Sequence, residues 1–342
     1  MKRQGFIFER LISDENITMA ILNATKKKKY HRIRSKLLSE REKTVAQIQT
    51  MLKEKSYVPT TPKEIKRFEP RSQKWRVISK VPVFPDQIIH HALIQVTLPL
   101  LKRGMDYYCS ANVKNRGNHY AKEAVEKFVR KDIKNTKYCL KMDIRKFYPS
   151  IHQDLMKEKI KRVIKDPNII WLFDCIIDSY PHGLPIGLYT SQWLANFYLQ
   201  SLDHFIKEKL HAPYMVRFAD DIVIFSSNRR RLMRMKQSLD EFFELEIKPS
   251  WRLFKITDKQ AVDFVGFKIY RKKTSIRKRI WLPIKRTMLK IISKLKKGLE
   301  VSEYLIRRFF SYYGYIKHSD HYKIEWKYLR FIDFEYLKSL VK

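Results

Sequence analysis

Three aspartates interrupt apolar runs in the middle of the chain: Asp143, and the adjacent pair Asp220 and Asp221. Adjacent carboxylates between apolar residues repel each other and are costly to remove from water. A cation placed between them removes that cost, and hard oxygen ligands favour Mg²⁺. Carboxylates that hold two Mg²⁺ ions at one level can serve phosphoryl transfer, in which one ion activates the attacking oxygen and the other steadies the leaving group.

The residues around these aspartates predict how they are positioned. YMVRFADDIVIFSS (214–227) places two β-rich runs around Ala-Asp-Asp and therefore predicts a hairpin with the carboxylates at its tip. KYCLKMDIRKFYPSI (137–151) begins as a strand that carries Asp143. Taken singly, the pair could be an exposed polar turn, and Asp143 could be a structural partner of a lysine. Both alternatives are less plausible for three aspartates in so basic a chain.

The composition indicates an anionic partner. Lys and Arg number 72 against 35 Asp and Glu, a net charge of +37. Such an excess repels itself unless a polyanion screens it, and each neutralised phosphate of a nucleic acid adds affinity by releasing counterions. A membrane surface is the other anionic candidate, but the charge is spread along the whole chain. No membrane span or signal peptide is expected, and neither a zinc site nor a disulfide framework is expected from Cys109, Cys139 and Cys175.

The remaining patterns predict a mixed α+β protein. Strands are expected at 74–84 and 262–270, and a Pro/Gly-rich loop at 181–187. The helix at 190–210 is expected to begin with Thr190 as its cap. Further helices are expected at 17–55, 86–104, 119–134, 229–244 and from about 284 to the end.

Five segments together resemble the motifs of reverse transcriptases. FADD (218–221) resembles their catalytic box and MDIRKFYPSI (142–151) their first palm motif, with 77 residues from Asp143 to Asp220. GLPIGLYTSQWLANFYL (183–199) resembles the loop-helix motif between them, WRVISKVPVFPDQIIHHAL (75–93) the fingers motif and FVGFKI (264–269) the strand near the primer grip.

The resemblance implies a right-hand polymerase fold of fingers, a palm with an antiparallel catalytic sheet, and a helical thumb. It implies an N-terminal helical extension and fingers at 1–135, a palm at 136–275 and a thumb at 276–342. The implied activity is RNA-directed DNA synthesis in the cytoplasm of a bacterium or from a phage, with template RNA, primer and deoxynucleoside triphosphates as partners and two Mg²⁺ ions, for which Mn²⁺ can substitute.

The resemblance also implies roles for single residues. Asp143, Asp220 and Asp221 would be the catalytic metal ligands, with Asp221 the least essential, and the Ile144 carbonyl would be a further ligand. Tyr148 matches the steric gate that excludes a ribose 2′-hydroxyl, although it could be a core tyrosine.

Nucleotide contacts are implied at seven positions in all. Besides Tyr148, they are Lys74 and Arg76 at the triphosphate, Ile186, Gly187 and Gln192 near the nascent base pair, and Lys248 near the triphosphate.

One departure from the commonest loop motif suggests a subfamily. Ile186 and Gln192 stand where many bacterial relatives have Gln and Pro, a pattern that resembles the enzymes of diversity-generating retroelements. Those enzymes make errors opposite template adenine and work with a small basic accessory protein that forms an oligomer. The alternatives are a phage-defence, retron or intron-derived reverse transcriptase, or a catalytically idle RNA-binding protein with the same fold.

Overall fold

The computed structural model describes residues 3–27, 30–69, 74–242, 244–320 and 322–341. The chain forms two compact units, and each consists of several chain segments. The first unit comprises Met1–Tyr107, Ile144–His211 and Phe242–Lys248, and the second comprises Tyr108–Asp143, Ala212–Glu241 and Pro249–Lys342. The three-domain division expected from the sequence remains a proposal. Within the described part of the chain, no helix is long and apolar enough to cross a membrane.

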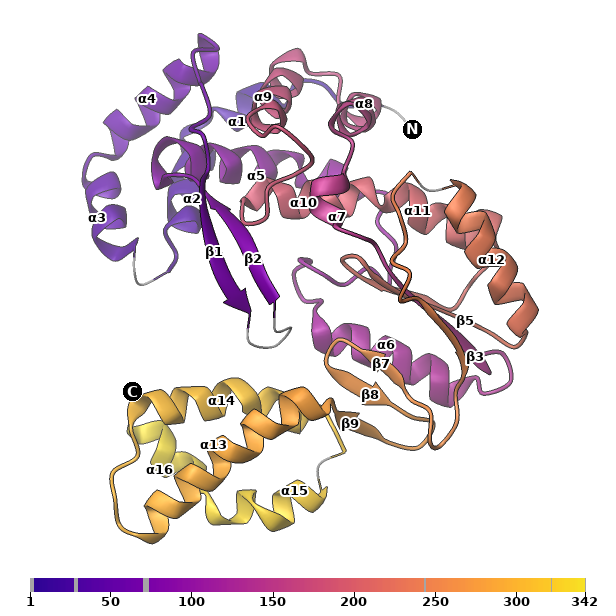
Figure 1. Ribbon diagram of the computed structural model, residues 1–342. Helices are drawn as coiled ribbons and strands as arrows, with labels where there is room; N and C mark the ends of the chain where they lie inside the picture. Colours follow the sequence, from indigo (N-terminus) through magenta and orange to yellow (C-terminus); the bar gives the residue numbers. More distant parts are fainter. Residues whose placement is uncertain (1–2, 28–29, 70–73, 243, 321, 342) are drawn as a thin grey trace. The chain divides into compact units, whose positions relative to one another are not determined.

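The first unit is mostly helical, and the hairpin β1–β2 extends from its helices (Figure 1). In chain order, its elements are α1 (Phe8–Leu11), α2 (Asp14–Ala24), α3 (His31–Ser39), α4 (Arg41–Lys53), β1 (Lys63–Glu69), β2 (Lys74–Lys80), η2 (Val83–Gln87), α5 (Ile88–Lys102), α7 (Phe147–Ser150), α8 (Gln153–Val163), α9 (Pro167–Asp178), α10 (Tyr189–Tyr198), α11 (Gln200–His204) and η3 (Phe205–Lys209).

Helix α5 is the centre of this unit. It is apolar on nearly every side and packs against α2 and α10, as expected of a helix buried all round. The carboxylate of Asp166 caps α9 and also accepts hydrogen bonds from the backbone N–H groups of Ile7 (2.8 Å) and Phe8 (2.9 Å). These hydrogen bonds connect α1 to a helix some 160 positions later in the chain. They also satisfy a buried carboxylate, which needs hydrogen-bond donors.

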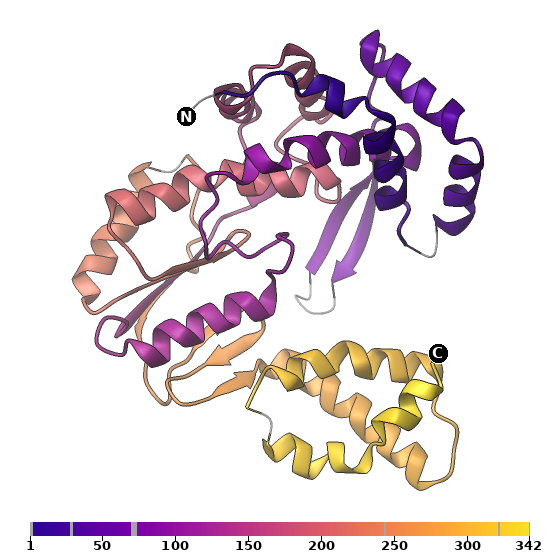
Figure 2. The same cartoon turned by 180° about the vertical axis from the view of Figure 1, so that it is seen from behind.

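The second unit contains two antiparallel sheets and a helical bundle. The four-stranded sheet has the order β4-β5-β3-β6, the three-stranded sheet has the order β7-β8-β9, and α6 packs against β4 and β8 (Figure 2). In chain order, the elements are α6 (Asn118–Lys131), β3 (Tyr138–Asp143), β4 (Met215–Phe218), β5 (Asp221–Ser226), α12 (Arg229–Phe242), β6 (Arg252–Lys255), β7 (Val262–Phe264), β8 (Phe267–Ile269), β9 (Thr274–Ile276), α13 (Lys278–Lys296), α14 (Glu303–Lys317), α15 (Tyr322–Lys327), η4 (Leu329–Phe331) and α16 (Phe334–Ser339).

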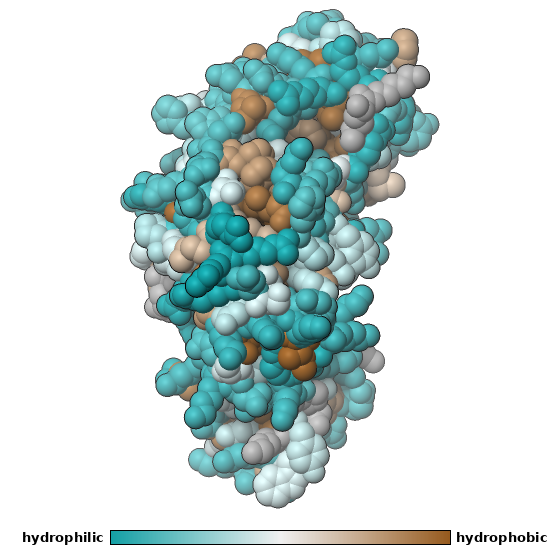
Figure 3. Space-filling model, turned by 90° about the vertical axis from the view of Figure 1, so that its right-hand side faces the viewer, coloured by the Kyte–Doolittle hydropathy of each residue, from teal (hydrophilic) through white to brown (hydrophobic). Residues whose placement is uncertain are grey.

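One hydrophobic core joins these parts of the second unit. It contains Val125 of α6, Phe225 of β5, Phe267 of β8 and Met288 of α13, all at most 2% exposed. The strand that carries Asp221 therefore rests on the same core as the C-terminal bundle. The outer face shown in Figure 3 is mostly hydrophilic, in line with the charged composition.

The predicted α+β class is confirmed, and most of the predicted elements are present. Two predictions were wrong. Thr190 does not cap α10, because the chain leaves its extended conformation at Leu188 and Thr190 is buried inside the helix, with its hydroxyl 3.4 Å from His90 Nδ1. The strand predicted at 262–270 is a hairpin of β7 and β8, turned at Val265 and Gly266, which both have positive φ. The stretch 17–55, predicted to be helical, contains most of α2 together with α3 and α4, and its residues 28–29 lie outside the described residues.

Candidate active site

Two of the predicted carboxylates lie on neighbouring strands at the same level. Asp143 ends β3, Asp221 begins β5, and the two residues are directly paired in the antiparallel register. Asp220 lies in the turn that joins β4 to β5, next to Ala219, whose φ is +53°. A two-residue hairpin turn normally has Gly or Asn at such a position, and strained backbone of this kind concentrates at functional sites. The hairpin predicted from the sequence is thus present, with Asp220 and Asp221 at its tip.

Asp221 is in an environment that disfavours its charge. Its side chain is 27% exposed, yet its Oδ1 atom is buried and has no hydrogen-bond partner among the described residues. Burial, together with the charge of Asp143, raises the pKa of Asp221, and Lys141 and Arg277 oppose the shift; the resulting pKa is about 6. A carboxylate oxygen without a donor, beside a second carboxylate, is a position that a divalent cation would satisfy.

Asp143 and Asp221 are the residues that could bind a metal ion here. Within the described ranges, no group of three or more His, Cys, Asp or Glu side chains is arranged to hold a metal ion. The structure thus brings Asp143 and Asp221 together and leaves Asp220 beside them in the turn. Ile144, whose carbonyl is the further predicted ligand, is buried and forms an isolated antiparallel bridge with Ile247.

Lys141 is a neighbour of the carboxylates that the sequence reasoning missed. Its Nζ atom lies 3.5 Å from Asp221 Oδ2 and also donates a hydrogen bond to the Asp263 carbonyl. Because side chains two positions apart on a strand share a face, its spacing from Asp143 was a usable signal. A lysine here supplies part of the positive charge that the carboxylates need.

A basic cavity of about 860 Å³ opens beside Asp143. Arg277 lines it and donates from Nε to Asp263 Oδ1 at 2.7 Å. The cationic residues that line the cavity outnumber the two acidic ones, Asp143 and Asp263; they are Lys141, Arg252, Lys268, Arg277, Lys278 and Arg279. Such a lining suits phosphate groups.

In the first unit, the predicted nucleotide loop lies against strand β2. The Ser79 N–H donates to the Ile186 carbonyl at 2.7 Å. Gly187 has a φ of +120°, and a Cβ atom on it would stand 2.5 Å from the Ser79 carbonyl oxygen. Only glycine fits there without a backbone shift. The close approach of Gly187 to a base pair stays a prediction, and the structure adds a close approach to Ser79 of β2.

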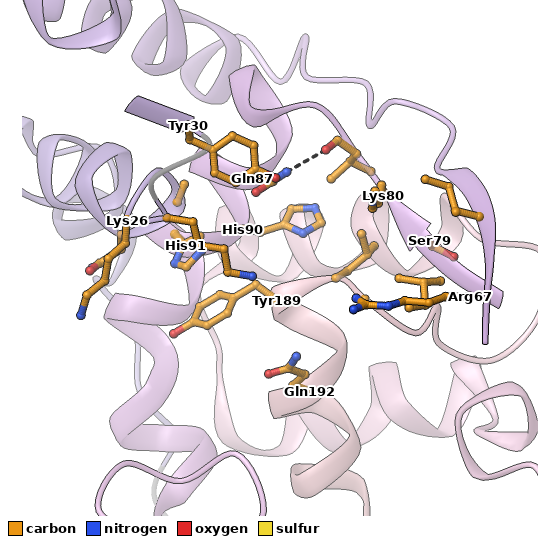
Figure 4. A pocket seen from close by; sticks show the side chains of 18 residues that line it. Lys26, Tyr30, Arg67, Ser79, Lys80, Gln87, His90, His91, Tyr189 and Gln192 are labelled. Carbon is orange, nitrogen blue, oxygen red and sulfur yellow. Dashed lines mark hydrogen bonds between the residues drawn. The ribbon is translucent and has the colours of Figure 1, made fainter. Parts of the chain in front are cut away.

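This loop borders a pocket of about 530 Å³ (Figure 4). Gln192 projects toward the pocket from α10, and Arg67 lies on its other side. The rings of His91 and Tyr189 stack on each other with centroids 3.9 Å apart. Burial lowers the pKa of both His90 and His91 to about 4. Both imidazoles are therefore neutral at pH 7, and the positive charge of the pocket comes from Lys26, Lys27, Arg67 and Lys80.

Comparison with known families decides the identity. The model of the family "Reverse transcriptase (RNA-dependent DNA polymerase)" matches residues 61–269, more than half of the chain. The chain belongs to the reverse transcriptase family. The match also confirms the predicted right-hand polymerase fold, to which the helices and antiparallel sheets conform. Reverse transcriptase domains generally use divalent metal ions, as the carboxylate pair requires.

Solved structures that match this chain include telomerases from two Candida species. A Candida tropicalis telomerase without its C-terminal domain is 15% identical, with a TM-score of 0.46 over 65% of this chain and 55% of that one. The Candida albicans telomerase in complex with a fragment of telomeric RNA is 10% identical, with a TM-score of 0.48 over 83% of this chain and 60% of that one. The reverse transcriptase chain thus spans 55 to 60% of these telomerases. Curated protein sequences give no match.

The remaining predicted nucleotide contacts of this reverse transcriptase all lie in the first unit. Tyr148 is half-buried in α7 beside Phe147. Lys74 and Arg76 are exposed on β2, where Arg76 Nε donates to Glu69 at 2.7 Å and would have to exchange that partner to reach a triphosphate. Lys248 is half-buried near the end of the segment that follows α12. Their roles remain proposals.

Proposed function

We propose that this reverse transcriptase adds deoxynucleoside monophosphates to a primer 3′-hydroxyl on an RNA template and releases pyrophosphate. The observation that carries the proposal is the paired register of Asp143 and Asp221, together with the orphaned Oδ1 of Asp221, in a chain of this family. Phosphoryl transfer is largely a matter of positioning and charge neutralisation, so these residues supply what the reaction needs.

Each group at the site has a task in this reaction. Asp143, Asp220 and Asp221 would hold two divalent ions. Hard oxygen ligands favour Mg²⁺, and Mn²⁺ could take its place. When bound, the ions lower the pKa of the primer hydroxyl and neutralise charge on the triphosphate. Lys141 limits repulsion between Asp143 and Asp221 through its contact with Asp221. The cations of the 860 Å³ cavity bind backbone phosphates of the primer strand.

The first unit binds the incoming nucleotide and the template. Arg76 and Lys74 contact the triphosphate, with Lys248 as a further cation, and Tyr148 excludes a ribose 2′-hydroxyl. The pocket at Gly187 and Gln192 receives nucleic acid, because its neutral histidines and stacked aromatic wall suit a base, while Arg67 suits a phosphate.

The experiment is primer extension on RNA and DNA templates of equal sequence, with Mg²⁺, Mn²⁺ or a chelator. We expect extension on RNA with either metal, none with the chelator, and loss in Asp220→Ala. The exposed acid Asp258 provides the control Asp258→Asn, which should retain full activity. Extension by Asp220→Ala at the wild-type rate would refute the proposal, and metal-dependent RNA binding without extension would favour an idle RNA-binding protein.

We further propose that the enzyme serves a diversity-generating retroelement, is error-prone opposite template adenine, and acts with a small basic accessory protein that forms an oligomer. Support comes from Ile186 and Gln192, because the apolar Ile186 side chain cannot offer the hydrogen bonds of a glutamine and discrimination can loosen. Sequencing of extension products from wild type and Ile186→Gln, with and without the accessory protein, tests this. We expect the wild-type enzyme to make frequent errors opposite template adenine and Ile186→Gln to make fewer. An accurate wild-type enzyme would exclude the retroelement assignment.

A further inference from the structure

Aromatic rings stand on the surface of the C-terminal bundle with cations over their faces. Trp326 is 62% exposed and Phe331 is 43% exposed. The guanidinium carbon of Arg330 lies 4.4 Å from the centroid of the Trp326 ring and 4.6 Å from that of Phe331. Lys296 Nζ lies 5.1 Å from the Phe331 centroid. We call these four residues the stacking strip.

Neighbouring residues hold the strip in place. Tyr328, Leu329 and Ile332 are at most 8% exposed and belong to the core of the second unit. Tyr328 and Leu329 lie between Trp326 and Phe331, and Ile332 directly follows Phe331, so the segment that carries the two exposed rings is held against the core. A ring that is already ordered loses little conformational entropy when a ligand stacks on it.

The two cations of the strip are a second feature that suits an anionic ligand. Neither Arg330 nor Lys296 has an ion-pair partner within 4.0 Å among the side chains that the structure describes, which exclude Lys323 and Glu325. Residues 278–342 contain 16 Lys and Arg against 6 Asp and Glu. Exposed rings interleaved with cations suit a ligand that has both flat faces and negative charge.

We propose that the stacking strip binds single-stranded nucleic acid outside the catalytic site. Unpaired bases stack on Trp326 and Phe331, and the backbone phosphates contact Arg330 and Lys296. A duplex does not offer this contact, because its base faces are already stacked on their neighbours. RNA and DNA strands share the recognised chemistry.

Three members of the strip, Trp326, Arg330 and Phe331, follow α14 in the chain, and Lys296 is the last residue of α13. Figures 1 and 2 show α14 and α15, the helix that carries Trp326, on opposite sides of α13. An enzyme with this strip can hold an unpaired template or product strand during synthesis.

The test is fluorescence anisotropy with labelled 12-nucleotide oligo(U) and oligo(dT) and a 12-base-pair duplex, in the presence of a chelator so that no synthesis occurs. Trp326→Ala should weaken single-strand binding about 5- to 50-fold, as expected from the loss of one stacked base. Trp326→Phe should retain affinity within about threefold, because the ring remains. Tyr336→Ala removes an exposed aromatic outside the strip and should change nothing.

A second variant guards against effects on folding. Arg330→Gln should lower the slope of log affinity against log salt by about 0.7 for single strands, as expected for one lost phosphate contact. If Trp326→Ala weakens binding of oligo(U) alone, the strip binds an RNA strand; if it weakens binding of oligo(dT) alone, the strip binds a DNA strand. Either result supports the proposal. Unchanged binding in Trp326→Ala, or equal weakening of the duplex, would overturn it. The polymerase proposal is untouched by these results, because the assay measures no catalysis.

Discussion

Burial shifts the pKa of titratable groups in opposite directions at the acid pair of the second unit and at the Gly187 pocket of the first unit. At the acid pair, two like charges face each other, and burial raises the pKa of Asp221 to about 6. At the Gly187 pocket, burial lowers the pKa of His90 and His91 to about 4, so the inner wall is neutral and the charge comes from lysines and Arg67. The first site calls for an added cation, whereas the second is ready for an anion.

This difference separates chemistry from binding. A site with unresolved like-charge repulsion suits ions that take part in the reaction, while a neutral aromatic wall with cations suits a nucleotide that is only held. Substitutions at the two sites should therefore fail in different ways.

The largest effect is expected at the acid pair. Asp143→Asn should lower the rate of single-turnover extension on the order of 10³-fold. The reason is that charge neutralisation by a bound metal ion lowers the activation barrier by several kcal/mol. Nucleotide affinity should change little. Rapid-quench extension measures both, with Asp258→Asn as the matched acid-to-amide control. A rate within tenfold of wild type would remove Asp143 from the chemistry.

At the Gly187 loop, the expected effect is steric. Gly187→Ala should lower the unfolding free energy by about 2–4 kcal/mol, since the new Cβ atom would meet the Ser79 carbonyl oxygen at 2.5 Å and φ is +120°. Gly298→Ala is the control, because Gly298 has a φ of +64° and open space around it. Its cost should be about 1 kcal/mol, from backbone strain alone. Equal costs in urea denaturation would show that the contact with β2 is unimportant.

The neutral histidines predict a pH dependence of stability. His90 has a folded pKa near 4 and an unfolded pKa of 6.5, so the unfolded chain binds more protons between these values. The stabilisation is complete above pH 6.5 and is lost as the pH falls toward 4. Between pH 7 and pH 5, His90 should account for about 2 kcal/mol of lost stability. His90→Gln should flatten that part of the profile in urea denaturation, and an unaltered profile would contradict the assignment.

The smallest effect is expected at the edge of the Gly187 pocket. Arg67→Ala should weaken template binding about 3- to 10-fold and reduce the salt slope by about 1, as expected for one phosphate contact. Extension at saturating template should be unchanged. Lys53→Ala, an exposed cation of α4, is the control in an anisotropy titration over salt. Identical slopes for both variants and wild type would exclude Arg67 from contact.

The sequence predicted the acid hairpin because Asp220 and Asp221 stand between two β-rich runs, and turn chemistry is local. It also predicted the family, since the order of the motifs survives without any knowledge of contacts. The pairing of Asp143 with Asp221 could be expected but not its orphaned oxygen, because burial of one atom depends on residues far apart in the chain.

Other features needed the fold. Thr190 is of a residue type that often caps helices, but α10 begins at Tyr189, and Thr190 is buried inside the helix with its hydroxyl 3.4 Å from His90 Nδ1. Val265 and Gly266 reverse the chain inside an apolar run, and the glycine was the local signal for that turn. The lowered pKa values of His90 and His91 follow from burial, which the spacing of two adjacent histidines does not reveal.

Binding of Mn²⁺ to the wild-type chain and to the double variant Asp143→Asn/Asp221→Asn tests the central claim most directly, because it requires no template and no activity. Free Mn²⁺ would be followed by electron paramagnetic resonance as protein is added, with Asp258→Asn as control. The account predicts saturable binding to wild type and control, and its loss in the double variant. Equal binding to all three proteins would contradict the assignment of the metal site to this pair of carboxylates.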